Sequence, residues 1–322
     1  MKLLYALMFL MMTASGFAEY GDGGYAGAFL RMGFEARSKA LGDAFTAVPE
    51  GAVAGLYNPA MLPHLSTREV ILSCSFLPLD RNLNYIGVAL PSRPKARGKD
   101  GSAPLNAGIS LGWVSAGVDN IDGRDGSGNH TSMLSNSEHA FYMSFAVSPT
   151  SFFSIGLSGK VLYNRIPDIA EEGGALTSTG FGIDVGAFLK PYQGVTLGLV
   201  VRDNMSKYSW NTDKVYERGT STVYEFPRVV RLGAAYRIPR QWLLLVADYE
   251  ISNVQNPRIH LGVELTWQHI GALRLGFDHD KPTLGLGLNI NIWRHRTMLN
   301  YAVIPGLDAL SPDHMFSWSV AF

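Results

Sequence analysis

From residue 69 to the C-terminus, the sequence repeats one pattern in which apolar residues alternate with small or polar ones. Successive side chains of a β-strand point to opposite faces, so this period of two predicts strands with one apolar and one polar face. The alternation is clearest in five segments, 105–115, 153–163, 179–189, 258–267 and 283–292. The apolar face of such strands needs a cover, and either a second sheet or a lipid bilayer can provide it.

The polar face favours the bilayer. It consists mainly of Gly, Ser and Asn with scattered charged residues, which suits a crowded lumen better than a surface washed by water. Only 17% of all residues are charged, below the roughly 25% of soluble domains. Aromatic residues recur at the ends of the apolar stripes, as in the interfacial girdles of membrane barrels: Trp113, Tyr163, Tyr249, Trp267 and Trp318. Past the N-terminal segment, no run of 18 apolar residues predicts a spanning helix.

The number of strands specifies the architecture. We expect fourteen antiparallel strands, near residues 69–78, 82–90, 105–116, 139–148, 152–164, 178–190, 194–203, 227–238, 242–251, 257–268, 271–279, 283–293, 296–304 and 313–322. An even number is typical of bacterial single-chain barrels, as is the alternation of short turns with longer loops. The longer, polar loops are 117–138, 165–177, 204–226 and 305–312. The basic segment 91–104 is also long, but strand parity places it with the short turns, on the periplasmic side.

The N-terminus predicts export. Lys2 precedes an apolar stretch at residues 3–12, and the small residues Gly16 and Ala18 follow it, which is the pattern of a signal peptide cleaved near Ala18. Cys74 is the only cysteine, so neither an intramolecular disulfide nor a cysteine-based zinc site can form. Together with the barrel pattern, this predicts a protein of the bacterial outer membrane.

The C-terminus has the pattern of a barrel-assembly signal. Outer-membrane barrels commonly end in an aromatic residue with hydrophobic residues at every second position before it, which the barrel-assembly machinery recognises. Here the alternating residues are Phe316, Trp318, Val320 and the terminal Phe322. Outer-membrane lipid and this machinery are therefore expected partners.

Residues 19–68 differ from the rest of the chain. They are rich in Ala and Gly and predict one or two short helices with breaks at Gly42, Pro49 and Pro59. Such a segment is too short to build a core alone, so we expect it to pack inside the barrel lumen as a hatch. The predicted organisation is thus all-β: a signal peptide (1–18), a short helical hatch in the lumen (19–68) and a fourteen-stranded antiparallel transmembrane barrel (69–322). We interpret the Asn58-Pro59 pair as the point where the hatch ends.

Three motifs in the hatch resemble a known family. Residues 30–37 read Leu-Arg-x-Gly-x-x-Ala-Arg, residues 42–48 read Gly-x-Ala-Phe-x-Ala-Val, and Asn58-Pro59-Ala60 follows. These motifs resemble the PorV/PorQ family of outer-membrane proteins, within the FadL-like superfamily. The resemblance implies a non-enzymatic role in type IX-like protein secretion and surface attachment, with a translocon and cargo proteins as partners. Its alternative implication is FadL-like transport of long-chain fatty acids or other hydrophobic compounds through the hatch and a lateral opening.

Charged residues are candidates for a site in the lumen. In the hatch, Arg31, Arg37, Asp43 and Glu50 could form a latch with charges of the barrel wall, or could satisfy one another. On the strands, the inward candidates either line a passage or fill the lumen as a structural network: Lys160, Asp184, His260, Glu264, Arg274 and Asp278.

Other classes of function are disfavoured. A net charge of zero provides no basic surface for nucleic acid. No nucleophile motif, phosphate-binding loop or metal-spaced histidine pair is present, so we expect neither an enzyme, nor a cofactor, nor a metal. Segment 119–130 superficially resembles a calcium loop, but His130 stands where the bidentate Glu of an EF-hand belongs.

Overall fold

The computed structural model describes residues 24–93, 105–167, 174–213, 218–268, 270–292, 295–306 and 310–322. Within residues 24–68, four short helical pieces precede the strands: η1 (Ala28–Arg31), α2 (Ala36–Ala40), α3 (Ala54–Tyr57) and η2 (Pro59–His64). None of the described helices is long and apolar enough to cross a membrane.

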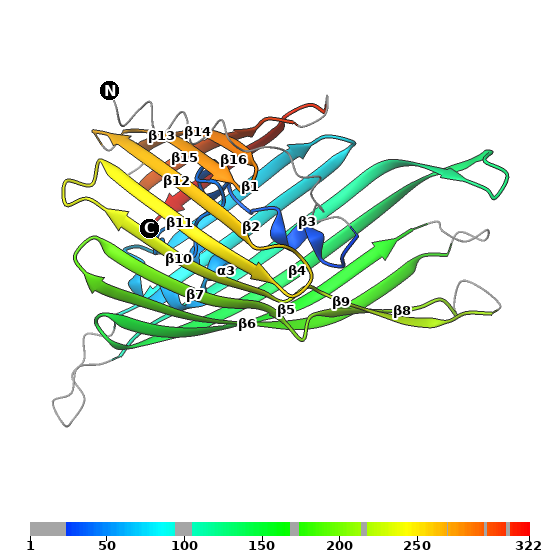
Figure 1. Cartoon of the computed structure of the whole chain (residues 1–322), viewed down its shortest axis with the longest axis horizontal. Helices are drawn as coiled ribbons and strands as arrows, with labels where there is room; N and C mark the ends of the chain where they lie inside the picture. Colours follow the sequence, from blue (N-terminus) through cyan, green and yellow to red (C-terminus); the bar gives the residue numbers. More distant parts are fainter. Residues whose placement is uncertain are drawn as a thin grey trace.

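The described strands form one antiparallel sheet that closes on itself (Figure 1). They are β1 (Glu69–Leu77), β2 (Arg81–Ser92), β3 (Asn106–Arg124), β4 (His130–Thr150), β5 (Phe153–Ile166), β6 (Leu176–Tyr192), β7 (Val195–Asn204), β8 (Lys207–Asn211), β9 (Ser221–Glu225), β10 (Val229–Arg237), β11 (Leu243–Ser252), β12 (Arg258–Trp267), β13 (Gly271–Asp278), β14 (Lys281–Ile292), β15 (His295–Ile304) and β16 (Asp313–Ala321). The strands β1–β7 and β10–β16 form the ring, which β1 closes by pairing with β16. The prediction of a fourteen-stranded antiparallel barrel is confirmed.

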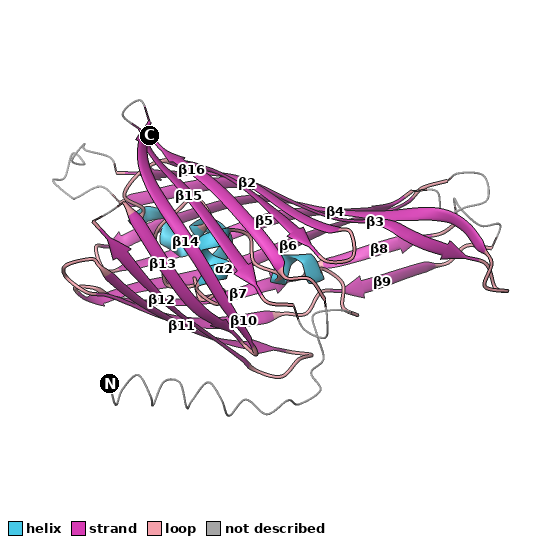
Figure 2. Cartoon of the chain, turned by 90° about the horizontal axis from the view of Figure 1, so that it is seen from above, coloured by secondary structure: helices cyan, strands magenta, loops and turns pink. Residues whose placement is uncertain are grey.

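Two predicted loops contain strands instead. Segment 117–138 continues β3 and β4 as a long hairpin, and segment 204–226 contains the β8–β9 hairpin. Both project beyond the ring in the same direction (Figures 1 and 2). Segment 117–138 is rich in Asp, Asn and Gly, which are uncommon in strands, so the sequence pattern predicts a loop where the first hairpin lies. Its turn is held by the Asp125 carboxylate, which accepts hydrogen bonds from the backbone N–H groups of Ser127 and Asn129, both at 2.9 Å.

The two faces of the wall follow the sequence pattern. Outward residues such as Leu111, Leu157, Phe181 and Leu286 are about half exposed, as expected of a surface that lipid covers. The Gly, Ser and Asn residues that alternate with them along each strand point inward.

We name the two ends of the barrel by their connections. The long-loop end carries the β3–β4 and β8–β9 hairpins, and the short-turn end carries the turns 151–152 and 193–194.

The basic segment 91–104 can be placed only by its flanks. β2 ends and β3 begins at the short-turn end, because their register pairs Ser92 with Ala107. Residues 94–104 themselves lie outside the described residues.

The helical pieces lie inside the ring, and both views show strands around them (Figures 1 and 2). Hatch side chains and inward wall side chains form one buried apolar cluster: Phe29, Leu30, Phe34, Leu41, Phe45, Tyr57, Met61 and Leu62 from the hatch, with Leu83, Tyr85, Val114, Leu162, Phe188, Leu244 and Val246 from the wall. The core of this protein is therefore shared between hatch and barrel.

Candidate functional site

The hatch contacts two different parts of the barrel. Charged side chains of its first part, residues 36–50, contact strands β10–β13, which we call the ion-pair wall. Helix α2 of this first part also lies against β14 and β15. The second part of the hatch, residues 54–64, faces strands β3–β6, which we call the small-residue wall.

Arg37 is the centre of the first contact. Its guanidinium binds Glu264 of β12 through two hydrogen bonds of 2.8 and 2.9 Å, and Glu50 of the hatch through a third of 2.8 Å. Arg274 of β13 donates to the same Glu264 at 2.7 Å. Burial alone would raise the pKa of Glu50, but Arg37 and Arg237 hold it below its ordinary value. Arg37 thus pairs both within the hatch, with Glu50, and across to the wall, with Glu264.

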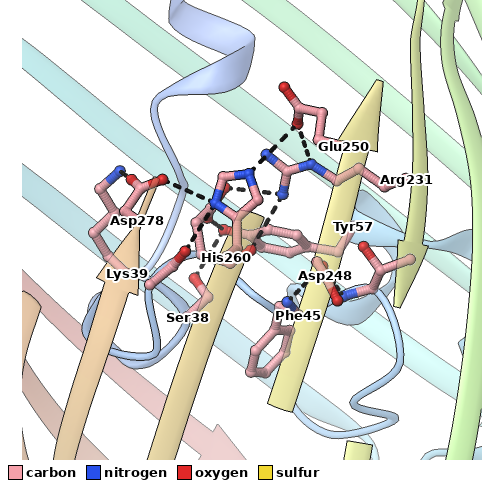
Figure 3. A network of polar contacts seen from close by, with 12 residues as sticks. Ser38, Lys39, Phe45, Tyr57, Arg231, Asp248, Glu250, His260 and Asp278 are labelled. Carbon is pink, nitrogen blue, oxygen red and sulfur yellow. Dashed lines mark hydrogen bonds and ion pairs between the residues drawn. The ribbon is translucent and has the colours of Figure 1, made fainter. Parts of the chain in front are cut away.

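A second set of ion pairs surrounds Asp43. Its carboxylate accepts a hydrogen bond from Arg231 of β10 at 3.1 Å and another from the Tyr57 hydroxyl. Arg231 also pairs with Glu250 of β11, and it is almost completely buried (Figure 3). Asp43 adopts a left-handed backbone conformation with φ of 62°, which these side-chain contacts hold in place.

The third set lies beside Lys39. Its ammonium group contacts the Asp278 carboxylate of β13 at 2.5 Å, and His260 of β12 lies 2.9 Å from the same carboxylate. Asp248 of β11 accepts the backbone N–H groups of Phe45 and Thr46 at 3.1 and 3.0 Å. Figure 3 shows these side chains converging on the hatch from neighbouring strands.

The small-residue wall binds the hatch by close approach. Gly108, Ala146, Gly156 and Gly186 are register partners across β3, β4, β5 and β6, and they form a continuous row without large side chains. A Cβ atom at Gly156 would lie 2.5 Å from the amide nitrogen of Ala60. The glycine alternation in the sequence therefore has a specific cause, because the hatch backbone occupies the space of the missing side chains.

Hydrogen bonds at this wall come from uncharged groups. Ser144 donates to Gly55 O at 3.2 Å, and Ser154 donates to Ala60 O at 2.6 Å. His64 lies 3.1 Å from the Ser154 hydroxyl. Burial, followed by the charges of Lys190 and Arg93, lowers the pKa of His64 to about 4. Among the described residues of 54–64 and β3–β6, no ion pair joins hatch and wall.

Asn58-Pro59 has a different role from the predicted one. The hatch does not end there, because η2 continues it to His64. Asn58 ends α3 and caps η2, with its side-chain oxygen accepting from the backbone N–H of Ala60 at 3.1 Å. Its side-chain nitrogen donates to Thr46 O and to Ala187 O of β6, both at 3.1 Å. This fully buried side chain ties together both parts of the hatch and the wall.

The remaining predicted residues lie elsewhere in the lumen. Lys160 and Asp184 form a buried ion pair at 2.7 Å, and Asp203 of β7 joins them at 2.6 Å from Lys160. Arg31 is buried in η1. The six lumen candidates thus divide into this cluster and the ion-pair wall, to which His260, Glu264, Arg274 and Asp278 belong.

Sequence reasoning missed Arg231, Asp248 and Glu250. All three fall on inward positions of β10 and β11 once the register is known, because Arg231 pairs with Glu250 and Gly233 with Asp248. Continuing the period of two along residues 229–237 and 243–252 would have placed them in the lumen.

The predicted assembly signal forms the closing strand. Phe316, Trp318 and Phe322 lie on the outer surface with about half of each side chain exposed. Val320, on the same strand face, pairs with Val70 of β1. Within the described residues, no group of three or more His, Cys, Asp and Glu side chains could hold a metal ion.

No protein-family model and no curated protein matches this sequence. Solved structures do match the fold. A deletion mutant of the monoaromatic hydrocarbon channel TodX has a TM-score of 0.61 and 14% identity, over 90% of this chain and 99% of that chain. A Pseudomonas aeruginosa FadL homologue has a TM-score of 0.61 and 12% identity, over 90% and 98%. The Pseudomonas putida toluene transporter TodX has a TM-score of 0.56 and 14% identity, over 89% and 97%. The chain therefore has the fold of FadL- and TodX-like outer-membrane barrels.

Proposed function

We propose that this protein is an outer-membrane channel for hydrophobic small molecules. The observation that carries the proposal is the apolar core of the lumen, in which hatch residues such as Phe34, Phe45 and Leu62 pack against inward wall residues. A water-filled porin has a polar lumen. An apolar lumen instead favours apolar solutes, because the transfer of apolar surface out of water is favourable. The similarity in fold to a toluene transporter and to a FadL homologue supports the same conclusion.

Passage requires part of the hatch to move. Separating the ion-pair wall from the hatch would leave several buried charges without partners, at a cost of about 3–5 kcal/mol for each broken pair. Separating the small-residue wall breaks packing contacts and neutral hydrogen bonds instead, each of about 0.5–1.5 kcal/mol. We infer that residues 54–64 move away from β3–β6 while residues 36–50 stay bound.

Uptake measurements test this function. The protein is expressed in a bacterial host that lacks hydrocarbon channels, and the entry rates of labelled toluene and of a labelled disaccharide are compared. We expect faster entry of toluene and unchanged entry of the disaccharide. Equal acceleration of both would indicate a general porin, and acceleration of neither would exclude a channel for such compounds. Phe322→Asp, which we expect to prevent assembly, is the negative control.

A PorV/PorQ-like role in secretion is the second candidate. Besides the hatch motifs, the long β3–β4 hairpin and the β8–β9 hairpin favour it, since both offer protein surface beyond the ring. Met133, Val223 and Tyr224 are exposed there. In this role the hairpins bind exported cargo or a translocon, and the lumen stays closed. Purification from the native membrane distinguishes the two roles, because the secretion role predicts that secreted proteins co-purify, and that deleting 117–138 releases them.

A further inference from the structure

A polar cavity of about 400 Å³ opens at the short-turn end. We call it the arginine cavity. Hatch residues 49–51 and 64–67 line one side, and inward residues of β12–β16 line the other. Gln241, in the turn between β10 and β11, and Arg296, at the start of β15, are exposed members of the lining. The volume lies in the range of small-molecule sites, about 300–1,000 Å³.

Most of the lining of the arginine cavity is polar. Besides charged side chains, it contains hydroxyl and amide groups: Ser66, Thr67, Gln241, Thr266, Asn289 and Ser319. Apolar side chains are in the minority, so the cavity offers little surface to the hydrophobic compounds of the proposed function. Its ligand should therefore be a different, polar molecule.

The buried charges of the cavity are unequal in number. The carboxylates of Glu50 and Glu264 are shared by three guanidinium groups at distances of 2.7–3.6 Å, those of Arg37, Arg237 and Arg274. One positive charge of this set thus lacks a matching anion.

The neighbouring charges do not supply that anion. Glu69 and Arg296 also line the cavity, and they add one charge of each sign. Glu35 lies near Arg37 and Arg274 but does not line the cavity, and desolvation raises its pKa to about 7. About half of the Glu35 carboxyl groups are therefore protonated at neutral pH.

Arg274 has a hydrogen-bond donor that no described residue uses. Its side chain is only 3% exposed, its Nε donates to Glu264 at 2.7 Å, and its Nη1 has no hydrogen-bond partner among the described residues. Gly287 makes room for the guanidinium, because a Cβ atom there would lie 2.7 Å from Nη1. A buried N–H group without a partner is unfavourable, so a ligand that accepts a hydrogen bond from Arg274 is favoured.

We propose that the arginine cavity binds the phosphate group of a small soluble phosphate monoester, with Arg274 and Arg296 as its cationic contacts. Guanidinium groups form strong, charge-assisted hydrogen bonds with phosphate oxygens. A phosphate monoester carries a charge of about −1.5 to −2 at pH 7 and has three acceptor oxygens, which suits a cavity with an unbalanced cation and several hydroxyl and amide donors. The inference goes beyond the proposed function, and its test involves no transport, so the channel and this site can fail separately.

Calorimetric titration of the purified protein in a neutral detergent at pH 7 tests the proposal, with glycerol 3-phosphate and glycerol as probes. We expect glycerol 3-phosphate to bind about tenfold or more tightly than glycerol, and its affinity to fall with added salt. Arg274→Gln and Arg296→Gln should each lower that affinity about tenfold. Glycerol 3-phosphate should also raise the unfolding temperature of the unaltered protein, and raise it less in both variants.

Arg240→Gln is the matched control, because Arg240 is an exposed cation of the same end that does not line the cavity. Equal losses in Arg240→Gln and Arg296→Gln would reduce the effect to surface charge and overturn the site. Arg296→Gln decides the matter if Arg274→Gln does not fold, since Arg296 is exposed and forms no ion pair with the described residues. Equal binding of glycerol 3-phosphate and glycerol would overturn the site as well.

A third probe separates the two sources of a phosphate group. Glycerophosphoglycerol is the headgroup of phosphatidylglycerol without its acyl chains, and it carries a phosphodiester with a single charge. Tighter binding of glycerol 3-phosphate supports a soluble monoester as the ligand. Tighter binding of glycerophosphoglycerol would overturn the monoester and assign the cavity to a lipid headgroup.

Discussion

The hatch backbone lies close to glycines of both walls, such as Gly262 and Gly156, but among the described residues ion pairs join it to only one of them. At the ion-pair wall, Arg37, Lys39 and Asp43 each contact a buried charge of β10–β13. At the small-residue wall, the hatch backbone lies against a row of Gly and Ala and is held by neutral hydrogen bonds. Charges buried in pairs resist separation because each would be left unpaired, whereas close packing is lost in small increments. The hatch can therefore stay bound to the ion-pair wall through residues 36–50 while residues 54–64 separate from the small-residue wall.

The largest expected effect comes from breaking the ion-pair wall. Glu264→Gln removes the shared acceptor of Arg37 and Arg274, and we expect it to lower the free energy of unfolding by about 3–5 kcal/mol. Urea unfolding of the barrel in lipid vesicles measures this. Glu225→Gln, on the exposed strand β9, is the control and should change stability by less than about 0.5 kcal/mol. Similar values for both variants would mean that the buried pairs contribute no more than surface charges.

The stability of the protein should also depend on pH through Glu35, the hatch residue directly before the ion-paired segment 36–50. This hatch residue is buried, and desolvation raises its pKa to about 7 from an ordinary value of 4.5. The folded protein therefore binds a proton more readily than the unfolded chain, and its contribution to stability is lost as pH rises from about 4.5 to about 7. The expected loss is on the order of 3 kcal/mol.

Comparing the protein with Glu35→Gln isolates this contribution. The difference in unfolding free energy between them should change between pH 5 and pH 8 and stay constant above pH 8. A constant difference over the whole interval would mean that Glu35 has an ordinary pKa.

The small-residue wall should respond to added volume. A Cβ atom at Gly156 would lie against the Ala60 backbone, so Gly156→Ala should destabilise the hatch by about 1–3 kcal/mol. Gly159→Ala, on the same strand, is the matched control because the nearest atoms to its Cβ lie 3.8 Å away, in ordinary contact. Hydrogen exchange of residues 54–64 measures the effect. Faster exchange in both variants would indicate a general weakness of β5 and not a response of the hatch.

Much of the fold could be predicted from the sequence, because lipid on one side and a crowded lumen on the other impose the period of two on every spanning strand. The alternation of apolar and polar residues is lost where a strand extends beyond the lipid. The outer part of β3 contains Asp119 and Asp122, and Asp125 lies in the turn that follows, so the sequence pattern predicts a loop for this segment.

The site was predictable only in part. Arg37 and Glu264 could be identified as inward or hatch charges, but their pairing depends on the register between segments 227 residues apart. The period of two predicts that glycines such as Gly156 face the lumen, but the reason for them, the backbone of Ala60 lying against the wall, depends on the three-dimensional structure.

The smallest expected effect concerns the joint between the two parts of the hatch. Asn58→Ala removes the cap of η2 and the bonds to Thr46 O and Ala187 O, which we expect to cost about 1–2 kcal/mol. Because Asn58 links residues 36–50 to residues 54–64, its loss should uncouple them. Hydrogen exchange should then accelerate in 54–64 and remain slow in 36–50, where the ion pairs are intact. Equal acceleration in both parts would show that the hatch opens as one unit, and the distinction between a fixed and a releasable side would be wrong.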